Sequence, residues 1–290
     1  MAVDSFIPEV WSAELQTALN ANLVLSGNGA INRDYEGDIR QGGDTVHIGA
    51  LSDPNISNYV KNVTVIDPQT LSTTDQALLI DQAKYFAFEV DDVDEAQVKD
   101  GGKLLSTAAT RAAYRLQKAA DTYTGTLMVA GAGSVLSPLD VTSPSSAYVV
   151  LVRLRTALDR AEVPTQGRWV AVSPEFYSML LLDPRFTDAS ASGSGAVLTN
   201  GVVGRAAGFE IRVSTNLPAG TAGTSPEVSS FIIAGHSMAT TFADQIVKTE
   251  AYRPQNSFSD AIKGLHVYGA KVVRPEALSV IDVDVTVPNS

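Results

Sequence analysis

The chain has 290 residues, a formal charge of −11 at pH 7, 44% hydrophobic and 18% charged residues, and no cysteine. This composition is typical of one large or two moderate globular domains and excludes a disordered or fibrous chain. The lack of cysteine excludes disulfides, thiolate nucleophiles and Cys-ligated zinc. The acidic balance argues against sequence-independent binding of nucleic acid by the whole surface, so any such contact is expected to be local.

The first third of the chain predicts a helical arm and then a long extended segment. Apolar residues recur at helical spacing from Phe6 to Leu23, with Pro8 in the first turn. From about Ile39 to Phe88 the pattern changes to strands, "TVHIGAL", "YVKNVTVI" and "QALLIDQAKYFAFEV", separated by turn residues. These strands have no helix of their own to pack against.

A single long helix is predicted next, from about Lys103 to Val129, because small and apolar residues line one face at steps of three or four. It would be roughly 40 Å long. Its stripe is mostly alanine, which favours packing on a sheet over a coiled-coil seam. The segment "GAGSVLSPLDVTSPSS" that follows is rich in Gly, Ser and Pro, and it predicts a loop and a domain boundary.

The second half predicts mixed helices and strands, in an α/β or α+β layer. Helices are expected at 147–163 and 174–183, the second with Ser173 as N-cap and Pro174 at its first position. Strands are expected at 167–173, 208–214, 229–236, 244–252, 264–273 and 278–287. The alternation in "VIDVDVTV" of the last strand predicts one buried and one exposed face.

The sequence contains few residues or motifs that are typical of catalytic sites. The three histidines, His47, His236 and His266, are far apart in the chain and do not form HExxH or HxH spacings. No phosphate-binding GxxxxGK and no GxSxG elbow occur. We therefore predict a protein that is not an enzyme, with no catalytic residue, cofactor or metal site. Among enzymes, the alternative is a hydrolase that acts through His236.

Several strings in a fixed order carry a family resemblance. They are "RDYEGDIRQGGDTVHI", "IDQAKYFAFEVDDVDEAQ", "RWVAVSPEFYSMLL", "GFEIRVSTNLP" and "GLHVYGAKVVRPEAL". Together with the order of predicted elements, the chain resembles, over nearly its full length, the major capsid proteins of tailed bacteriophages, which have the Hong Kong 97-like fold.

The resemblance implies an α+β fold with four parts. They are an N-terminal arm (1–38), an extended β-hairpin loop (39–87), a peripheral domain with the long spine helix (88–137 and 240–275) and an α/β axial domain (138–239 and 276–290). The extended segment then needs no core of its own, because it would pack on another copy of the chain; an isolated hairpin is only marginally stable.

The implied function is a major capsid protein that self-assembles as hexamers and pentamers into an icosahedral shell enclosing a double-stranded DNA genome, without sequence-specific binding. The expected place is the virion capsid, assembled in the host cytoplasm and without a membrane. Expected partners are a separate scaffolding protein, a portal and a decoration protein. The alternatives are a bacterial cargo-storing nanocompartment shell of the same fold and, less well matched in length and helix content, a tail-tube or decoration protein.

The candidate contacts between subunits are Trp11, Arg40, Tyr59, Lys61 and Arg253, and the candidate hinges are Gly42, Gly43, Gly101 and Gly102. Arg111, Arg115 and Lys118 are assigned to contacts between subunits as well. Some relatives crosslink a lysine of the extended loop to an asparagine of a neighbour. Lys61 and Lys84 are the lysines of this segment, but neither the asparagine nor the catalytic carboxylate can be matched, so the resemblance does not carry crosslinking to this chain.

Overall fold

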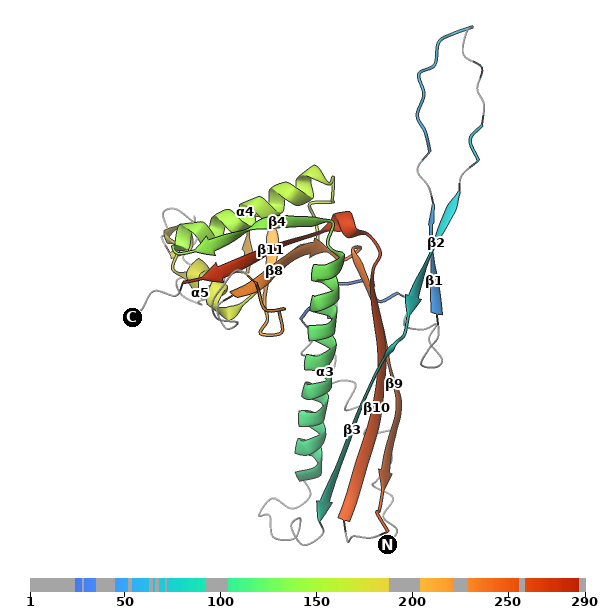
Figure 1. Ribbon diagram of the computed structural model, residues 1–290, viewed down its shortest axis with the longest axis vertical. Coiled ribbons are helices and arrows are strands. Elements are labelled where there is room, and N and C mark those ends of the chain that lie inside the picture. The colour runs from blue at the N-terminus through green and yellow to red at the C-terminus, as the bar shows by residue number, and fades with distance from the viewer. Residues whose placement is uncertain are drawn as a thin grey trace.

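The structure is a computed structural model, and it describes residues 24–27, 29–34, 45–51, 54–62, 65, 68–70, 72–91, 104–187, 204–221, 229–255 and 259–286. Figure 1 shows a broad sheet flanked by helices, and beside it a tall part in which the long helix α3 (Leu104–Gly131) stands next to three long strands. A thin two-stranded ribbon projects beyond the tall part (Figure 1). The predicted N-terminal helix lies outside the described residues.

The broad sheet has six strands in the order β4-β11-β8-β5-β7-β6. Their bounds are Ser134–Val141 (β4), Leu278–Val285 (β11), Ser229–His236 (β8), Arg168–Val172 (β5), Phe209–Val213 (β7) and Arg205–Ala206 (β6). The pairs β4–β11 and β5–β7 are parallel and the others are antiparallel. The sheet is therefore mixed, as in many α+β layers.

Helices α4 (Pro144–Arg160) and α5 (Pro174–Leu181) pack with this sheet, and the one-turn helix α6 (Pro184–Thr187) follows them. Ser143 caps α4 in a capping box with Ser146. The prediction for α5 is confirmed: Ser173 Oγ accepts a hydrogen bond from Phe176 N, and Pro174 is the first helical residue. The core beneath is apolar and contains Leu151, Leu154, Leu158, Trp169, Val170, Phe176, Phe209, Ile232, Ile233, Val280 and Ile281.

The tall part combines a three-stranded antiparallel sheet with α3. Its strand order is β3-β10-β9, with bounds Gln82–Asp91 (β3), Ser259–Val272 (β10) and Thr240–Tyr252 (β9). Helix α3 runs over the 28 residues Leu104–Gly131, which makes it about 42 Å long. Ala109, Ala113 and Leu116 pack against Phe86 and Phe88 of β3, which confirms that the alanine-rich stripe packs on a sheet.

Three predictions about local structure are wrong. The segment after α3 is not simply a loop, because β4 lies within it and pairs with β11. The described residues 59–62 and 65 lie outside any strand, although a strand was expected over 59–66. Strand β11 does not alternate between a buried and an exposed face: six of its eight residues, Leu278–Val283, are buried in succession. Both α4 and α3 contact β11, which explains why both faces are covered.

Strand β4 forms one edge of the six-stranded sheet. Its pairing with β11 shifts register between Ile281 and Val283, at the point where Pro138 interrupts β4. A short 3₁₀ helix, Pro275–Ala277, connects β10 to β11. No helix within the described ranges is long and apolar enough to span a bilayer.

Candidate inter-subunit surface

The ribbon is formed by β1 (Thr45–Leu51), β2 (Thr73–Leu79) and the described residues between them. The strands pair antiparallel from Thr45 with Leu79 to Leu51 with Thr73. The described residues 54–60, 65, 68–70 and 72 have no regular secondary structure. Figure 1 shows that this part of the chain extends well beyond both sheets. The described residues between β1 and β2 thus lie away from both sheets, whereas Ile48 and Leu78 of the paired strands are buried.

Apolar side chains of the ribbon lie in solvent. Ile56 is 98% exposed and Val65 is 88% exposed, and Tyr59 and Val60 are also exposed. Covering an Ile or Val side chain fully is worth about 1.5–3 kcal/mol. Grouped exposed apolar residues on a soluble protein typically mark a surface for another protein. This part of the chain is therefore the candidate functional surface.

The base of the ribbon, in contrast, is fixed to the three-stranded sheet. Ile48, Leu78 and Ile80 are buried in a small cluster with Ala243 and Val267 of β9 and β10. This cluster joins the ribbon to the rest of the molecule through an apolar contact rather than through a flexible linker alone.

Polar contacts and close backbone packing add to this attachment. Lys271 Nζ donates a hydrogen bond to the carbonyl of Ala77 at 2.8 Å. Gly269 lies so close to the ribbon that an added Cβ would meet the carbonyl oxygen of Leu79 at 2.2 Å. The ribbon is therefore anchored at one end and free at the other.

The structure places the sequence-predicted contact residues in two regions. Tyr59 and Lys61 both lie exposed in the ribbon. Arg253 follows the end of β9, where its Nε lies 3.9 Å from the carboxylate of Asp260. Figure 1 shows this end of β9 far from the tip of the ribbon. Trp11, Arg40 and the four candidate hinge glycines lie outside the described residues.

Sequence reasoning missed Ile56, because it lies in the turn-rich string "SDPNIS". The only signal available in the sequence was an isolated isoleucine among turn residues.

Sequence reasoning also missed Tyr85 of β3, which is 79% exposed. Tyr85, Ala87 and Leu265 line a cavity of about 450 Å³ on the three-stranded sheet. Lys263 and Glu250 also line this cavity. Lys263 Nζ lies 2.8 Å from the Glu250 carboxylate, and this hydrogen bond raises the pKa of Lys263.

A buried carboxylate on α3 joins three parts of the chain. Asp121 is 1% exposed. Its oxygens accept hydrogen bonds from the backbone of Val24 and Ser26, from Ser26 Oγ at 2.6 Å, and from Asn216 Nδ2 at 3.4 Å. Buried carboxylates need such donors, since desolvation without them is costly. Asp121 therefore fixes the N-terminal segment and the loop after β7 to α3.

A second polar cluster holds the N-terminal segment on β9. Asn32 exchanges backbone hydrogen bonds with Thr240 and Phe242. Arg33 pairs with the Asp244 carboxylate at 2.5 Å, and the other oxygen of that carboxylate lies 3.1 Å from Nε2 of the buried His266. These contacts give His266 a structural role within the interior.

The other two histidines also contact residues of their own surroundings. His47 lies in β1, exposed, with Nδ1 2.6 Å from Asp75. His236 Nδ1 accepts a hydrogen bond from Met238 N. Among the described residues, no group of three His, Cys, Asp or Glu side chains is arranged to hold a metal ion. Each of the three histidines therefore has a local hydrogen-bond partner.

Aromatic rings pack where the ribbon returns to the tall part. Tyr268 of β10 is fully buried between Tyr123 of α3 and Phe242 of β9. Burial raises the pKa of Tyr268 to about 12. Tyr123 donates to the Asp81 carboxylate at 3.3 Å, and its pKa is raised by burial and by that carboxylate. Asp81 lies directly before β3, so this cluster ties the exit of the ribbon to α3.

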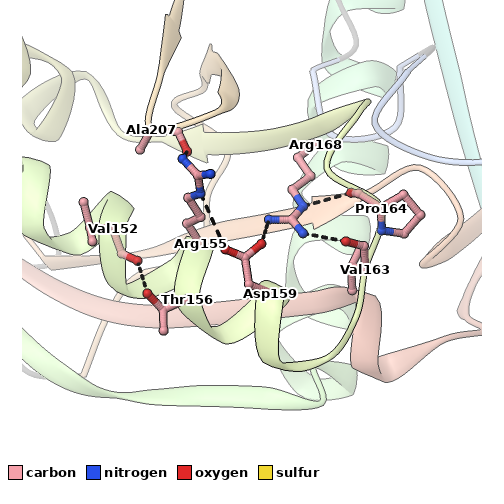
Figure 2. A network of polar contacts seen from close by, with 8 residues as sticks. All are labelled: Val152, Arg155, Thr156, Asp159, Val163, Pro164, Arg168 and Ala207. Carbon is pink, nitrogen blue, oxygen red and sulfur yellow. Dashed lines mark hydrogen bonds and ion pairs between the residues drawn. The ribbon is translucent and has the colours of Figure 1, made fainter.

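A polar network stabilises the broad sheet (Figure 2). The side chain of Arg168, at the start of β5, is 3% exposed. It donates to the carbonyls of Val163 and Pro164 and to the carboxylate of Asp159 on α4. The hydrogen bond from Arg168 holds the pKa of Asp159 below its usual value. Arg155 joins the same carboxylate from the other side (Figure 2).

Comparison with known proteins identifies the family of the chain. The phage capsid protein family matches residues 74–281. The chain belongs to this family. Its place is therefore among the structural, non-enzymatic proteins of bacteriophage capsids.

Solved structures give the same result. A chain of the structure described as Mycobacterium phage Che8 is 32% identical, with a TM-score of 0.75 over 97% of this chain and 98% of that one. The capsid of the cyanophage P-SCSP1u is 17% identical, with a TM-score of 0.68 over 86% and 85% of the two chains.

A virus-like particle from Pyrococcus furiosus is 14% identical, with a TM-score of 0.55 over 96% and 100% of the two chains. At such low identities, the cyanophage and Pyrococcus likenesses show the fold alone. Comparison with curated protein sequences finds no match.

Proposed function

We propose that this chain is a major capsid protein of the Hong Kong 97-like fold, and that its copies close an icosahedral shell around a double-stranded DNA genome. One observation carries the proposal: the ribbon is anchored at its base but exposes Ile56 and Val65 almost completely. A second copy of the chain would supply the surface that these side chains lack. Membership of the phage capsid protein family supports this assignment.

In this proposal each part of the chain has a structural role. The arm (1–38), the extended loop (39–87), the peripheral domain (88–137 and 240–275) and the axial domain (138–239 and 276–290) correspond to the four parts of such capsid proteins. The pairing of strands refines two of these limits. β3 begins at Gln82 and pairs with β10, and β4 begins at Ser134 and pairs with β11, so we assign them to the peripheral and axial domains.

Assembly would depend on many weak and repeated contacts. Covering the exposed apolar residues of one ribbon gives a few kcal/mol at most, since association loses entropy. Closed symmetric rings multiply each contact, so pentamers and hexamers become stable although a single pair of chains is not. A ribbon fixed only at its base tolerates the different angles between neighbours in the two kinds of ring.

Further proteins belong to this proposal. We expect a separate scaffolding protein to guide assembly in the host cytoplasm, a portal to admit DNA, and a decoration protein to bind the shell. The DNA would be enclosed without sequence-specific contacts.

The second candidate is a nanocompartment shell that stores cargo enzymes, because such a shell has the same fold as a viral capsid and the fold alone does not separate the two. Purified particles distinguish the two functions. A phage capsid contains DNA after infection or packaging, and a nanocompartment contains a protein cargo.

The primary test is assembly of the full chain, expressed with and without a scaffolding protein. Analytical ultracentrifugation and negative-stain electron microscopy should detect closed shells or capsomer-sized rings. A monomer under every condition would contradict the proposal.

A second test replaces the exposed apolar side chains of the ribbon. The double variant Ile56→Ser and Val65→Ser should lose assembly and remain folded. The matched control, Val149→Ser and Leu182→Ser, removes two exposed apolar side chains outside the ribbon and should assemble normally.

The four glycines Gly42, Gly43, Gly101 and Gly102 are proposed hinges for expansion of the shell, because glycine accepts backbone angles that other residues resist. The double variant Gly101→Ala and Gly102→Ala should fold and form immature shells but mature poorly. Normal mature particles from this variant would contradict the hinge role.

A further inference from the structure

Three basic side chains lie along one exposed face of α3. Arg111, Arg115 and Lys118 are separated by four and three residues, which places them within about 60° around the helix axis. All three are exposed. The opposite face of the helix carries Ala109 and Ala113, which pack on the three-stranded sheet. We refer to Arg111, Arg115 and Lys118 as the basic stripe; it faces away from the sheet.

The charge of the stripe is uncompensated within the described part of the chain. None of its three side chains takes part in an ion pair there, whereas Arg33, Arg168 and Lys263 each have a carboxylate partner. The only other charged residue of α3 is Asp121, and its buried carboxylate already accepts four hydrogen bonds from the N-terminal segment and Asn216. The exposed charge of the helix is therefore wholly positive, in a chain of net charge −11.

We infer that the basic stripe is a sequence-independent contact surface for the phosphate backbone of double-stranded DNA. The inference rests on the proposed shell function, because it requires that DNA be enclosed. The stripe is linear: Arg111 and Lys118 are about 10 Å apart along the helix axis. A duplex presents one negative charge per about 1.7 Å of its axis, so all three cations can face phosphates at once. Arginine also matches phosphate oxygens with two parallel N–H donors.

A second copy of the chain fits the stripe less well. Protein interfaces typically have cores depleted of charged residues and enriched in apolar and aromatic ones. On this face of α3, Tyr114 and Thr122 are the exposed neighbours of the three cations. Among the described residues, the most exposed apolar side chains lie instead on the ribbon, at Ile56 and Val65. This replaces our assignment of Arg111, Arg115 and Lys118 to contacts between subunits.

The expected binding is weak and strongly dependent on salt. Each phosphate contact contributes about −0.9 to the slope of log affinity against log salt concentration. Three contacts give a slope of about −2.7, so the affinity should fall about 40-fold between 50 and 200 mM salt. Such contacts hold DNA near the shell wall but let it slide, because no base is recognised.

The test uses the unassembled full chain and a fluorescently labelled 30-base-pair duplex of mixed sequence. Fluorescence anisotropy gives the affinity between 25 and 200 mM NaCl. The stripe variant is Arg111→Gln, Arg115→Gln and Lys118→Gln. The control is Arg160→Gln, Arg205→Gln and Arg274→Gln, which removes the same charge from exposed positions elsewhere. We expect the slope to be near zero for the stripe variant and unchanged for the control.

Three results would overturn the inference. The first is wild-type protein that does not bind the duplex at 25 mM salt. The second is an equal slope for the wild type and the stripe variant. The third is a stripe variant that binds DNA normally but no longer forms shells, which would assign the stripe to a contact between copies. Circular dichroism confirms that each variant is folded.

Electron microscopy of the wild type and the control separates this inference from the proposed function. If shells form, the proposed shell function is supported, even if the stripe variant and the wild type bind DNA equally. If neither shells nor rings form with a scaffolding protein, the shell function fails, whatever the affinity for the duplex.

Discussion

Arg168 and Asp159 connect the start of strand β5 to the end of helix α4, with Nη1 of the arginine 2.6 Å from Oδ1 of the carboxylate. The two ends of the pair differ in environment. The arginine side chain is buried and that of Asp159 is partly exposed. The arginine also satisfies the carbonyls of Val163 and Pro164 in the turn after α4. The pair therefore serves mainly to close this turn on the sheet.

Replacing Arg168 with methionine should destabilise the unassembled protein by about 2–4 kcal/mol, because two carbonyls lose their donor in the interior. The free energy of unfolding in urea measures this loss. Arg155→Met is the matched control. Its guanidinium is half exposed and makes only long contacts, 3.5 Å to Asp159 and 3.4 Å to the carbonyl of Ala207, so the control should lose less than about 1 kcal/mol. Equal losses would contradict the role given to Arg168.

The pH dependence of Asp159 follows from the same contact. The hydrogen bond from Arg168 lowers the pKa of Asp159 in the folded chain. The carboxylate therefore contributes stability above its unfolded pKa of about 3.9, and this contribution is lost as pH falls through the lower folded value. The stability difference between wild type and Asp159→Asn should be constant from pH 7 to 5 and shrink below about pH 4.

Urea unfolding at pH 7, 5, 4 and 3 measures this difference. Asp140→Asn is the control, since Asp140 is exposed and has no ion pair among the described residues. A difference for Asp159→Asn that does not change with pH would refute the prediction.

The Asp121→Asn variant should lose about 2–4 kcal/mol, because an amide cannot accept all four hydrogen bonds and its NH₂ group faces other donors. Hydrogen exchange at the amides of Val24 and Ser26 should rise at the same time, which a loss of helix stability alone would not produce selectively. Asp140→Asn again serves as the control. Unchanged protection of these two amides would show that Asp121 does not hold the segment.

Gly269→Ala should displace the base of the ribbon, because its Cβ would lie 2.2 Å from the backbone oxygen of Leu79, which cannot move aside cheaply. We expect the two sheets to remain folded and assembly to be lost. Gly49→Ala is the matched control: it lies in β1 of the ribbon, and an added Cβ there meets nothing within 4 Å. Sedimentation and electron microscopy measure assembly. If Gly269→Ala formed as many shells as the wild type, the anchoring role would be contradicted.

The sequence predicted those elements that depend on local signals. The α3 helix and the start of α5 follow from spacing and from the Ser173-Pro174 cap, so they were placed within two residues. Strand β4 was missed because its composition is typical of a loop, and it becomes a strand only by pairing with β11, more than 130 residues later. Distant pairing of this kind has no local signal.

The candidate surface was predicted in outline only. The lack of a core for the extended segment could be read from the sequence, since no helix accompanies its strands. The exposure of Ile56 could not, because it depends on where the ribbon ends relative to both sheets. Asp282 was expected on an exposed face of its strand but is buried, since Thr221 and Ser229 supply its hydrogen bonds from a loop and a neighbouring strand.

Strand β4 has a further consequence for how copies of the chain associate. The unpaired backbone groups of an exposed edge strand can form hydrogen bonds with the edge strand of another molecule. Repeated pairing of this kind extends into open fibres. Pro138 and the register shift interrupt this edge, and the opposite edge is β6, only two residues long. The broad sheet is thus a poor template for stacking end to end. Growth of open-ended aggregates by edge-to-edge strand pairing of this sheet is therefore disfavoured.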